Sequence, residues 1–138
     1  MMAQSLREAL LRDEGCHLKP YRDSRGFLTI GVGRCLETKG ISMAEAEMLL
    51  DNDLRDVFRL ADQIPWITDL DEARRNVLFN MAFNLGVQGV LGFTKTLELV
   101  QQGQYVKAAA EMLKSDWAKQ VPNRAARLSL QLEHGQWR

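Results

Sequence analysis

Residues 14–33 read EGCHLKPYRDSRGFLTIGVG, and this stretch carries the strongest structural signal in the chain. Aromatic and β-branched residues alternate in it with turn-forming residues, which is typical of a short antiparallel sheet. The clearest turn is expected at residues 23–26. We predict strands between Leu18 and Leu36 and no other sheet in the chain.

Helical patterns flank this stretch on both sides. A Ser-x-x-Glu capping box at residues 5–8 begins a predicted helix over about 5–13, and Gly15 ends it. A second capping box, at residues 42–45, begins a longer helix over about 42–62. At about 20 residues and 1.5 Å per residue, the longer helix spans roughly 30 Å and can link two lobes.

The second half of the chain, from Pro65 onward, has helical spacing. Thr68 or Asp69 is expected to cap an apolar helix that ends at Gly86 and lies in the middle of a bundle. Further helices come after it in the pattern. They are predicted at Phe93–Gln101, at Tyr105–Lys114, in a turn around Asp116–Lys119, and from Pro122 to His134.

These patterns predict one α+β domain over residues 1–138 that is mostly helical. A small N-terminal lobe, about 15–62, carries the short antiparallel sheet and includes the linking helix. A helical lobe, about 65–138, is expected to include the N-terminal helix at 5–13 as well.

The composition is that of one globular domain. The 138 residues are 46% hydrophobic and 26% charged, so a core can form without disulfides. The net charge of zero gives no overall attraction to nucleic acid. No segment has the apolar core of a signal peptide or approaches about 18 apolar residues in a row. We therefore expect synthesis in the cytoplasm and no stable membrane insertion.

Cysteines and histidines are too few for a structural zinc site. Cys16, Cys35, His17 and His134 are scattered, and we expect no metal and no cofactor. Reduced thiols are the default in a cytoplasmic protein, but a Cys16–Cys35 bridge is left open. The Gly-x-Gly at residues 31–33 lacks the further glycine and the lysine of phosphate-binding loops, which favours a turn or bulge.

Two carboxylates and a threonine are the residues most suited to catalysis. Glu14 ends the first helix, Asp23 follows nine residues later, and Thr29 six further on. Glycoside hydrolysis needs one protonated and one ionised carboxyl across a cleft. Glu14 is the acid candidate, because a helix C-terminus and partial burial both disfavour a carboxylate. By residue type alone, a turn aspartate and a solvated helix end are the commoner explanation.

Longer motifs strengthen the catalytic interpretation. Residues 12–15, 18–23 and 27–33 resemble the catalytic segment of the phage-type lysozymes, the endolysins of tailed bacteriophages. The spacing Glu-8x-Asp-5x-Thr is kept at Glu14, Asp23 and Thr29. The resemblance resumes at residues 70–75, 80–86, 92–94 and 117–127.

The resemblance implies hydrolysis of the β-1,4 bond between N-acetylmuramic acid and N-acetylglucosamine in peptidoglycan, with inversion. Glu14 would be the general acid. Asp23 and Thr29 would hold and activate the attacking water, the threonine hydroxyl both accepting from it and donating to it. Inversion requires carboxyl groups about 6.5–9.5 Å apart. The family also implies a monomer that lyses the host and reaches the periplasmic peptidoglycan from the host cytoplasm through a holin-type pore.

Further residues are carried over from the same resemblance. Arg124 corresponds to an arginine that reaches the catalytic glutamate. Asn84 stands at a substrate-contacting position where relatives have glutamine, and Asn80 and Phe93 are the other substrate-binding candidates. Arg34 stands where many relatives have histidine, so a histidine-dependent ion pair is absent there.

Three other functions fit parts of the pattern. A lytic transglycosylase cleaves the same bond without a water-holding aspartate, and a catalytically silent peptidoglycan-binding relative would lack one of the three residues. The retention of Glu14, Asp23 and Thr29 favours the hydrolase over both. A nucleic-acid binder, suggested by the arginines at 74–75 and 124–127, is disfavoured by the zero net charge.

Overall fold

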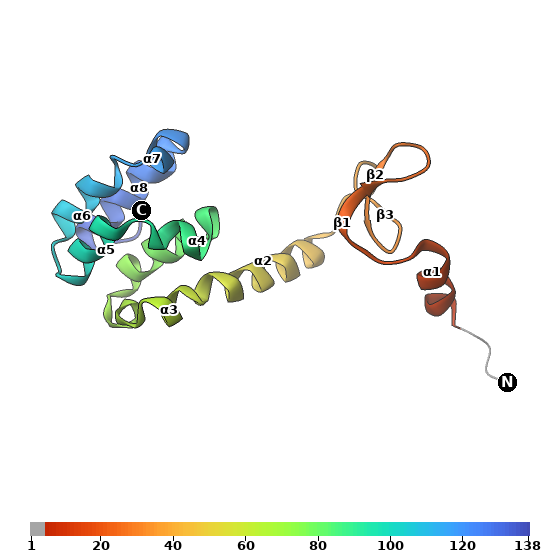
Figure 1. Ribbon diagram of the computed structural model, residues 1–138, viewed down its shortest axis with the longest axis horizontal. Helices are drawn as coiled ribbons and strands as arrows, with labels where there is room; N and C mark the ends of the chain where they lie inside the picture. Colours follow the sequence, from red (N-terminus) through yellow and green to blue (C-terminus); the bar gives the residue numbers. More distant parts are fainter. Residues whose placement is uncertain (1–4) are drawn as a thin grey trace. The chain divides into compact units, whose positions relative to one another are not determined.

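The computed structural model describes residues 5–138 and contains two compact units. The first ends at Leu49 and the second is Leu50–Arg138. The first holds helix α1 and a small sheet, and the second holds the remaining helices, from α3 onward (Figure 1). A mostly helical α+β protein with one small antiparallel sheet is therefore confirmed.

Helix α1 (Leu6–Glu14) forms as its capping pattern predicts. The Ser5 hydroxyl accepts a hydrogen bond from the Glu8 amide at 3.1 Å, and the Glu8 carboxylate accepts one from the Ser5 amide at 3.4 Å. Gly15, at a φ of 71°, ends the helix. The grouping of residues 5–13 with the helical lobe stays a prediction.

The sheet has three antiparallel strands in sequence order. Its strands are β1 (His17–Arg22), β2 (Leu28–Gly31) and β3 (Arg34–Cys35). Thr29 in the central strand pairs with Tyr21 on one side and Cys35 on the other. This register places the turn of residues 23–27 at one end of β2 and the Gly-x-Gly turn at the other.

The two cysteines are free. Cys16 precedes β1 and Cys35 lies in β3, so β2 separates them. Two strand spacings of about 4.8 Å exceed the Cα separation of about 7 Å that a disulfide tolerates. The Cys16–Cys35 bridge that the sequence left open is therefore not formed.

The linking helix is shorter than expected. Helix α2 (Met43–Phe58) begins with the predicted capping box but ends before residue 62, and a separate helix, α3 (Leu60–Gln63), comes next. At the break, the Arg59 amide donates to the Asp56 carbonyl at 3.2 Å. This i→i−3 bond tightens the turn and interrupts the α-helical pattern.

The apolar helix begins later in the chain than predicted. Residues Pro65–Asp69 form a 3-10 helix, η1, so neither Thr68 nor Asp69 caps the apolar helix. Helix α4 (Glu72–Leu91) is capped by Asp71, whose carboxylate accepts from the Arg74 amide at 3.1 Å. Gly86 breaks the helical conformation as predicted, at a φ of 78°, but a further helical turn continues after it.

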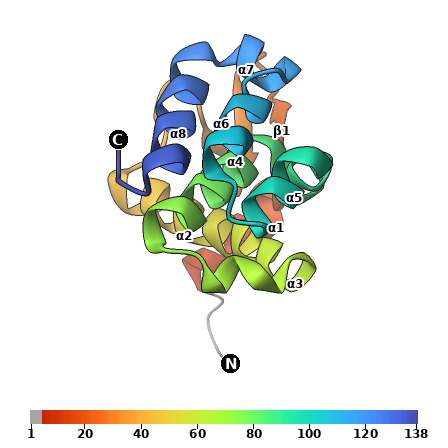
Figure 2. The ribbon, with the colours of Figure 1, turned by 90° about the vertical axis from the view of Figure 1, so that its left-hand side faces the viewer.

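The later helices lie within two residues of their predicted positions. They are α5 (Thr94–Gln101), α6 (Tyr105–Met112), α7 (Asp116–Gln120) and α8 (Pro122–His134). Helix α8 packs against α4, α6 and α7, and α5 packs against α6 (Figure 2).

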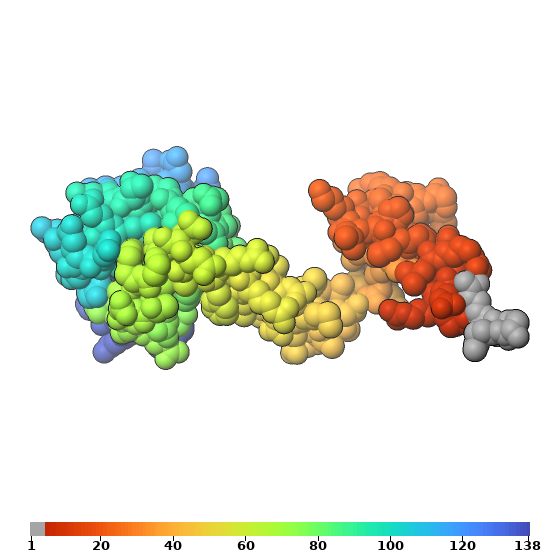
Figure 3. All heavy atoms as spheres, turned by 60° about the horizontal axis from the view of Figure 1, so that its bottom comes forward, coloured from red at the N-terminus to blue at the C-terminus, as the bar shows by residue number. Residues whose placement is uncertain are grey.

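An apolar core holds the second unit together. Helix α4 contributes Val77, Leu78 and Met81, all fully buried, and α8 contributes Leu128 and Leu132. The prediction of a central apolar helix is confirmed by this burial, and the space-filling view shows a closely packed body in lime to blue (Figure 3). Within residues 5–138, no single helix is long and apolar enough to cross a membrane; α4 and α5 pass that test only together, as a pair bent by 100°.

Candidate active site

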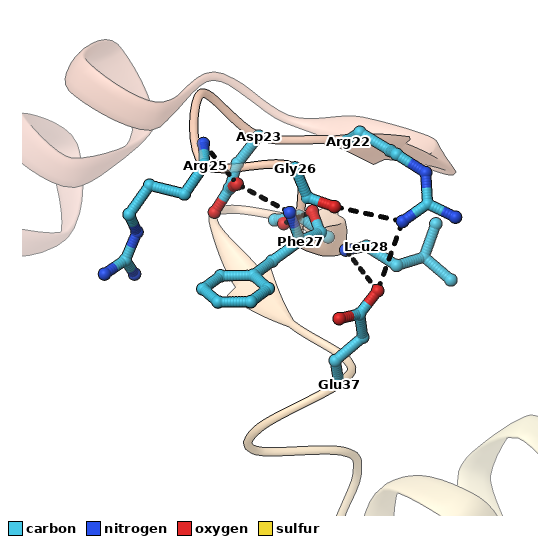
Figure 4. Close-up of polar contacts among 8 residues, drawn as sticks. Arg22, Asp23, Arg25, Gly26, Phe27, Leu28 and Glu37 are labelled. Atoms are coloured by element: carbon cyan, nitrogen blue, oxygen red, sulfur yellow. Dashed lines mark hydrogen bonds and ion pairs between the residues drawn. The ribbon is translucent and has the colours of Figure 1, made fainter.

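Asp23 is oriented by its own turn. Its Oδ1 atom accepts hydrogen bonds from the amides of Arg25 and Phe27, each at 2.9 Å (Figure 4). This is the Asx-turn geometry that aspartate favours. Among residues 5–138, the other carboxylate oxygen, Oδ2, has no hydrogen-bond partner, so it can accept one from a water molecule.

Thr29 is the only fully buried residue in the described part of the first unit, residues 5–49, with 3% of its surface exposed. Its hydroxyl donates to the Phe27 carbonyl at 2.9 Å, and that carbonyl also accepts from the Asp23 amide at 2.9 Å. Because its one proton is used in this way, Oγ1 can accept from a water but not donate to it. This corrects the expectation that the hydroxyl does both.

Phe27 therefore joins the two side chains expected to hold the water. Its amide bonds the Asp23 carboxylate, and its carbonyl bonds the Thr29 hydroxyl. One residue's backbone thus fixes both groups relative to each other. The sequence did not reveal this, because the contacts are made by the main chain and not by the Phe27 ring.

Glu14 lies against the opposite end of β2. A Cβ atom on Gly33 would be 2.8 Å from Glu14 Oε2 and 2.9 Å from its Cδ, so any other residue at this position would displace the carboxyl group. Gly33 also has a φ of 68°, which favours glycine. Within its unit Glu14 is exposed, so the expected partial burial against the sheet is wrong.

The sheet separates the two carboxyl groups. Asp23 lies in the turn before β2, and Glu14 packs on the turn after it. The four residues of β2 span about 10 Å at about 3.3 Å per residue. The first unit therefore brings Glu14, Asp23 and Thr29 to the two ends of one short strand.

The other candidates lie in the second unit, in two pairs. The guanidinium of Arg124 donates from Nε to Asn80 Oδ1 at 2.9 Å and from Nη2 to the Asn80 carbonyl at 3.2 Å. A contact between Arg124 and Glu14 would join the two units, and it stays a prediction. The Asn84 amide oxygen accepts from the indole of Trp117 at 2.7 Å, and the Phe93 ring meets Trp117 edge-on at 6.1 Å.

A family model and several known proteins match the sequence of the chain. Residues 12–130 match the family model described as phage lysozyme. The chain belongs to the phage lysozyme family. Residues 5–138 contain no group of three or more His, Cys, Asp or Glu side chains placed to hold a metal ion.

Relatives come from phages and from a cellular organism. The chain is 29% identical to a protein of Dictyostelium discoideum named probable T4-type lysozyme 1, over 97% of this chain and 96% of that protein. It is 29% identical to the endolysin of Salmonella phage P22, over 80% and 78%. It is 32% identical to the pre-baseplate central spike protein Gp5 of Enterobacteria phage T4, over 91% of this chain and 27% of that protein. Membership of the phage lysozyme family supports a peptidoglycan-lytic activity.

This member of the phage lysozyme family has an ion pair between Arg34 and Glu45 next to its sheet. Arg34 Nη1 donates to Glu45 Oε1 at 2.9 Å and to the Gly40 carbonyl at 3.0 Å. The same Glu45 oxygen accepts from the Ser42 amide at 2.8 Å. The Arg34 hydrogen bond, and then those of Ser42, lower the pKa of Glu45 from 4.5 to about 2. The pair ties β3 to the first turn of α2.

Cys35 is a neighbour of the catalytic candidates that sequence reasoning did not place. It pairs with Thr29 across the sheet. A hydrogen bond with the Thr38 side chain, and then one with its backbone, lower the pKa of the Cys35 thiol, while the negative charge of Asp23 opposes the shift. No sequence motif marks this position, because the register of a two-residue strand creates it.

Proposed function

We propose that this phage lysozyme is an endolysin that hydrolyses the β-1,4 bond between N-acetylmuramic acid and N-acetylglucosamine with inversion. The observation that carries the proposal is the Phe27 backbone, which holds the Asp23 carboxylate and the Thr29 hydroxyl together. Both leave an acceptor oxygen for one water molecule, and Glu14 lies toward the other end of β2.

In this mechanism Glu14 donates its proton to the glycosidic oxygen, and the bond from that oxygen to C1 of the muramic acid breaks. The water donates its two hydrogen bonds to Asp23 Oδ2 and Thr29 Oγ1, so that its oxygen lone pair points at C1. As the new bond to C1 forms, Asp23 accepts the water proton. Inversion requires a carboxyl separation of about 6.5–9.5 Å, which leaves room for this water between the two groups.

Product analysis tests the reaction. Purified peptidoglycan is digested with wild-type protein and with Glu14→Gln, a change that keeps the size of the side chain but removes its proton. We expect reducing muramic acid ends from the wild type alone. Products with 1,6-anhydro ends would make the protein a transglycosylase, and binding without any product would make it a silent peptidoglycan-binding relative.

The stereochemistry is tested separately with a soluble oligosaccharide of the same linkage. Proton NMR of the first-formed product should show the α-anomer before mutarotation, because attack comes from the face opposite the leaving group. An initial β-anomer would assign retention and would remove Asp23 from the role of base.

The biological role is proposed with the reaction. The enzyme acts as a monomer, binds peptidoglycan and no nucleic acid, and accumulates in the host cytoplasm until a holin-type pore lets it reach the periplasm. Expression in a bacterial host with and without an inducible pore protein tests this. Lysis only after pore induction supports the role, and lysis by the enzyme alone would contradict it.

A further inference from the structure

The turn that carries Asp23 is held from outside by two charged side chains. Arg22 Nη1 donates to the Gly26 carbonyl at 3.0 Å and to Glu37 Oε1 at 3.2 Å. The same Glu37 oxygen accepts from the Leu28 amide at 3.1 Å (Figure 4). Glu37 and Arg22 thus bind both sides of the turn, and we call this pair the turn clamp.

The Glu37 carboxylate accepts the hydrogen bond that a backbone carbonyl would accept if β3 were longer. Strand β3 ends at Cys35, and the last backbone hydrogen bond on that side runs from the Leu36 amide to the Leu28 carbonyl. The Leu28 amide lies beyond the end of β3, where no backbone carbonyl meets it, and it donates to Glu37 instead. The carboxylate therefore extends the hydrogen bonding of β2 to the residue next to Phe27.

The position of the clamp matters more than its strength. The side chains of Arg22 and Glu37 are 66% and 42% exposed, and ion pairs this exposed contribute little to overall stability. However, the clamp bonds Gly26 and Leu28, the two residues on either side of Phe27. Since Phe27 holds both Asp23 and Thr29, a shift of its backbone moves both groups.

We propose that Arg22 and Glu37 are positioning residues for the hydrolysis, which rests on the proposed function. The clamp fixes the peptide groups around Phe27, and the Phe27 peptide groups hold the two oxygens that align the water. Small displacements of aligned reacting groups cost large factors in rate. Loss of the clamp therefore lowers kcat and leaves substrate binding largely unchanged.

The first test compares loss with rescue. Glu37→Ala removes both hydrogen bonds, whereas Glu37→Gln keeps an amide oxygen that can accept from the Leu28 amide and from Arg22. We expect Glu37→Ala to lower kcat on the order of tenfold with KM within about twofold, and Glu37→Gln to restore most of the rate. Equal rates for Glu37→Ala and wild type would overturn the proposal, as would a change confined to KM.

The second test separates the backbone acceptor from the ion pair. The exchanged double variant R22E/E37R keeps two opposite charges but puts a donor where the Leu28 amide needs an acceptor, so it should stay as slow as Glu37→Ala. Lys119→Met is the matched control, because it removes another exposed ion pair, with Asp116, in the second unit. Full activity of the exchanged variant, or a similar loss in the control, would contradict the positioning role.

Amide hydrogen exchange tests whether the clamp orders the turn without relying on catalytic activity. The Leu28 and Phe27 amides should exchange faster in Glu37→Ala than in Glu37→Gln, with exchange in α8 unchanged. If wild-type protein cleaves no peptidoglycan, the proposed function fails while this comparison still reports whether the clamp orders the turn. Unchanged exchange in Glu37→Ala would show that it does not.

Discussion

The two units are stabilised in different ways. In the described part of the first, residues 5–49, Thr29 is the one fully buried residue, and turns, caps and polar side chains fix the backbone. The second unit has an apolar core built on α4 and α8, and some of its polar contacts close helix ends. For example, Arg74 donates to the carbonyls of Leu132 and Glu133 at the end of α8 and stacks on Tyr105.

This contrast shows where stability and catalysis are coupled. In the first unit the groups that set the backbone are the catalytic candidates themselves: Asp23 organises its turn, and Thr29 closes the hydrogen bond to Phe27. A substitution there changes structure and chemistry together. In the second unit, fully buried aliphatic side chains such as that of Leu78 make no polar contact, so their substitution should change stability alone.

The greatest loss should come from the helical core. Leu78→Ala leaves a cavity at a fully buried position, and we expect the free energy of unfolding to fall by about 2–5 kcal/mol. Circular dichroism at 222 nm during urea unfolding measures the loss. Leu130→Ala, at a residue 46% exposed on α8, is the control and should change stability by less than about 0.5 kcal/mol.

The catalytic rate of the Leu78→Ala protein tests whether the core affects stability alone. At a temperature where the Leu78→Ala protein is folded, its kcat should equal that of the wild type, because the site residues of the first unit are untouched. A reduced kcat in the fully folded variant would show that the core of the second unit also sets the geometry of the catalytic groups.

The second largest effect should be a loss of activity, which a comparison of alanine substitutions at Gly33 and Gly31 reveals. Gly33→Ala places a methyl group against the Glu14 carboxyl, and displacing this proposed general acid should lower kcat on the order of a hundredfold. Gly31→Ala is a matched control: Gly31 has nearly the same φ, 67°, but nothing within 4 Å of the added carbon. Both variants carry the same backbone strain, which circular dichroism and thermal unfolding should show. Equal activity of the two would mean that Glu14 does not depend on the space over Gly33.

The contrast between the units also explains how far the sequence predicts the structure. Periodicity and capping boxes place most helices within two residues, because apolar burial and caps are local signals. The spacing of Asp23 and Thr29 identifies them as candidates. The break at Arg59 and the Asp71 cap were missed, because 3-10 turns leave little mark on hydrophobic periodicity.

Side-chain contacts between residues distant in the sequence could not be predicted. The side chain of Glu37 bonds a residue nine positions away, and Arg34 bonds Glu45 eleven positions away. Neither pair is spaced as helix or turn neighbours are, so only the folded chain around β2, β3 and the start of α2 brings the partners together. The residues proposed to carry the chemistry could thus be named from the sequence, whereas the residues proposed to position them could not.

A pH dependence of the first unit should be the weakest effect. Hydrogen bonds from Arg34 and Ser42 lower the pKa of Glu45 from 4.5 to about 2, so the folded state favours the carboxylate more than the unfolded chain does. The resulting stability is present above about pH 4.5 and is lost as the pH falls toward 2. Glu45→Gln keeps a neutral acceptor but no charge, so wild type and variant should differ at pH 7, and the difference should shrink as the pH falls from about 4.5 toward 2. Urea midpoints followed by the NMR amide signals of β2 and β3 measure the difference, and a constant gap across this range would contradict the ion-pair account.

Arg34→His extends this last test, because it introduces the histidine that the family resemblance leads one to expect at this position. A histidine paired with Glu45 has a raised pKa in the folded state, so its contribution is full at low pH and is lost as the pH rises through that value, somewhat above about 6.5. Arginine stays charged over the whole range. The urea midpoint of the Arg34→His protein should therefore fall between pH 6 and 8, while that of the wild type stays level. If the urea midpoints of the two proteins changed with pH in the same way, the pair with Glu45 would not form in the variant. The arginine thus makes the link between β3 and α2 independent of pH around neutrality, in a unit whose described residues, 5–49, form no apolar core that could compensate for its loss.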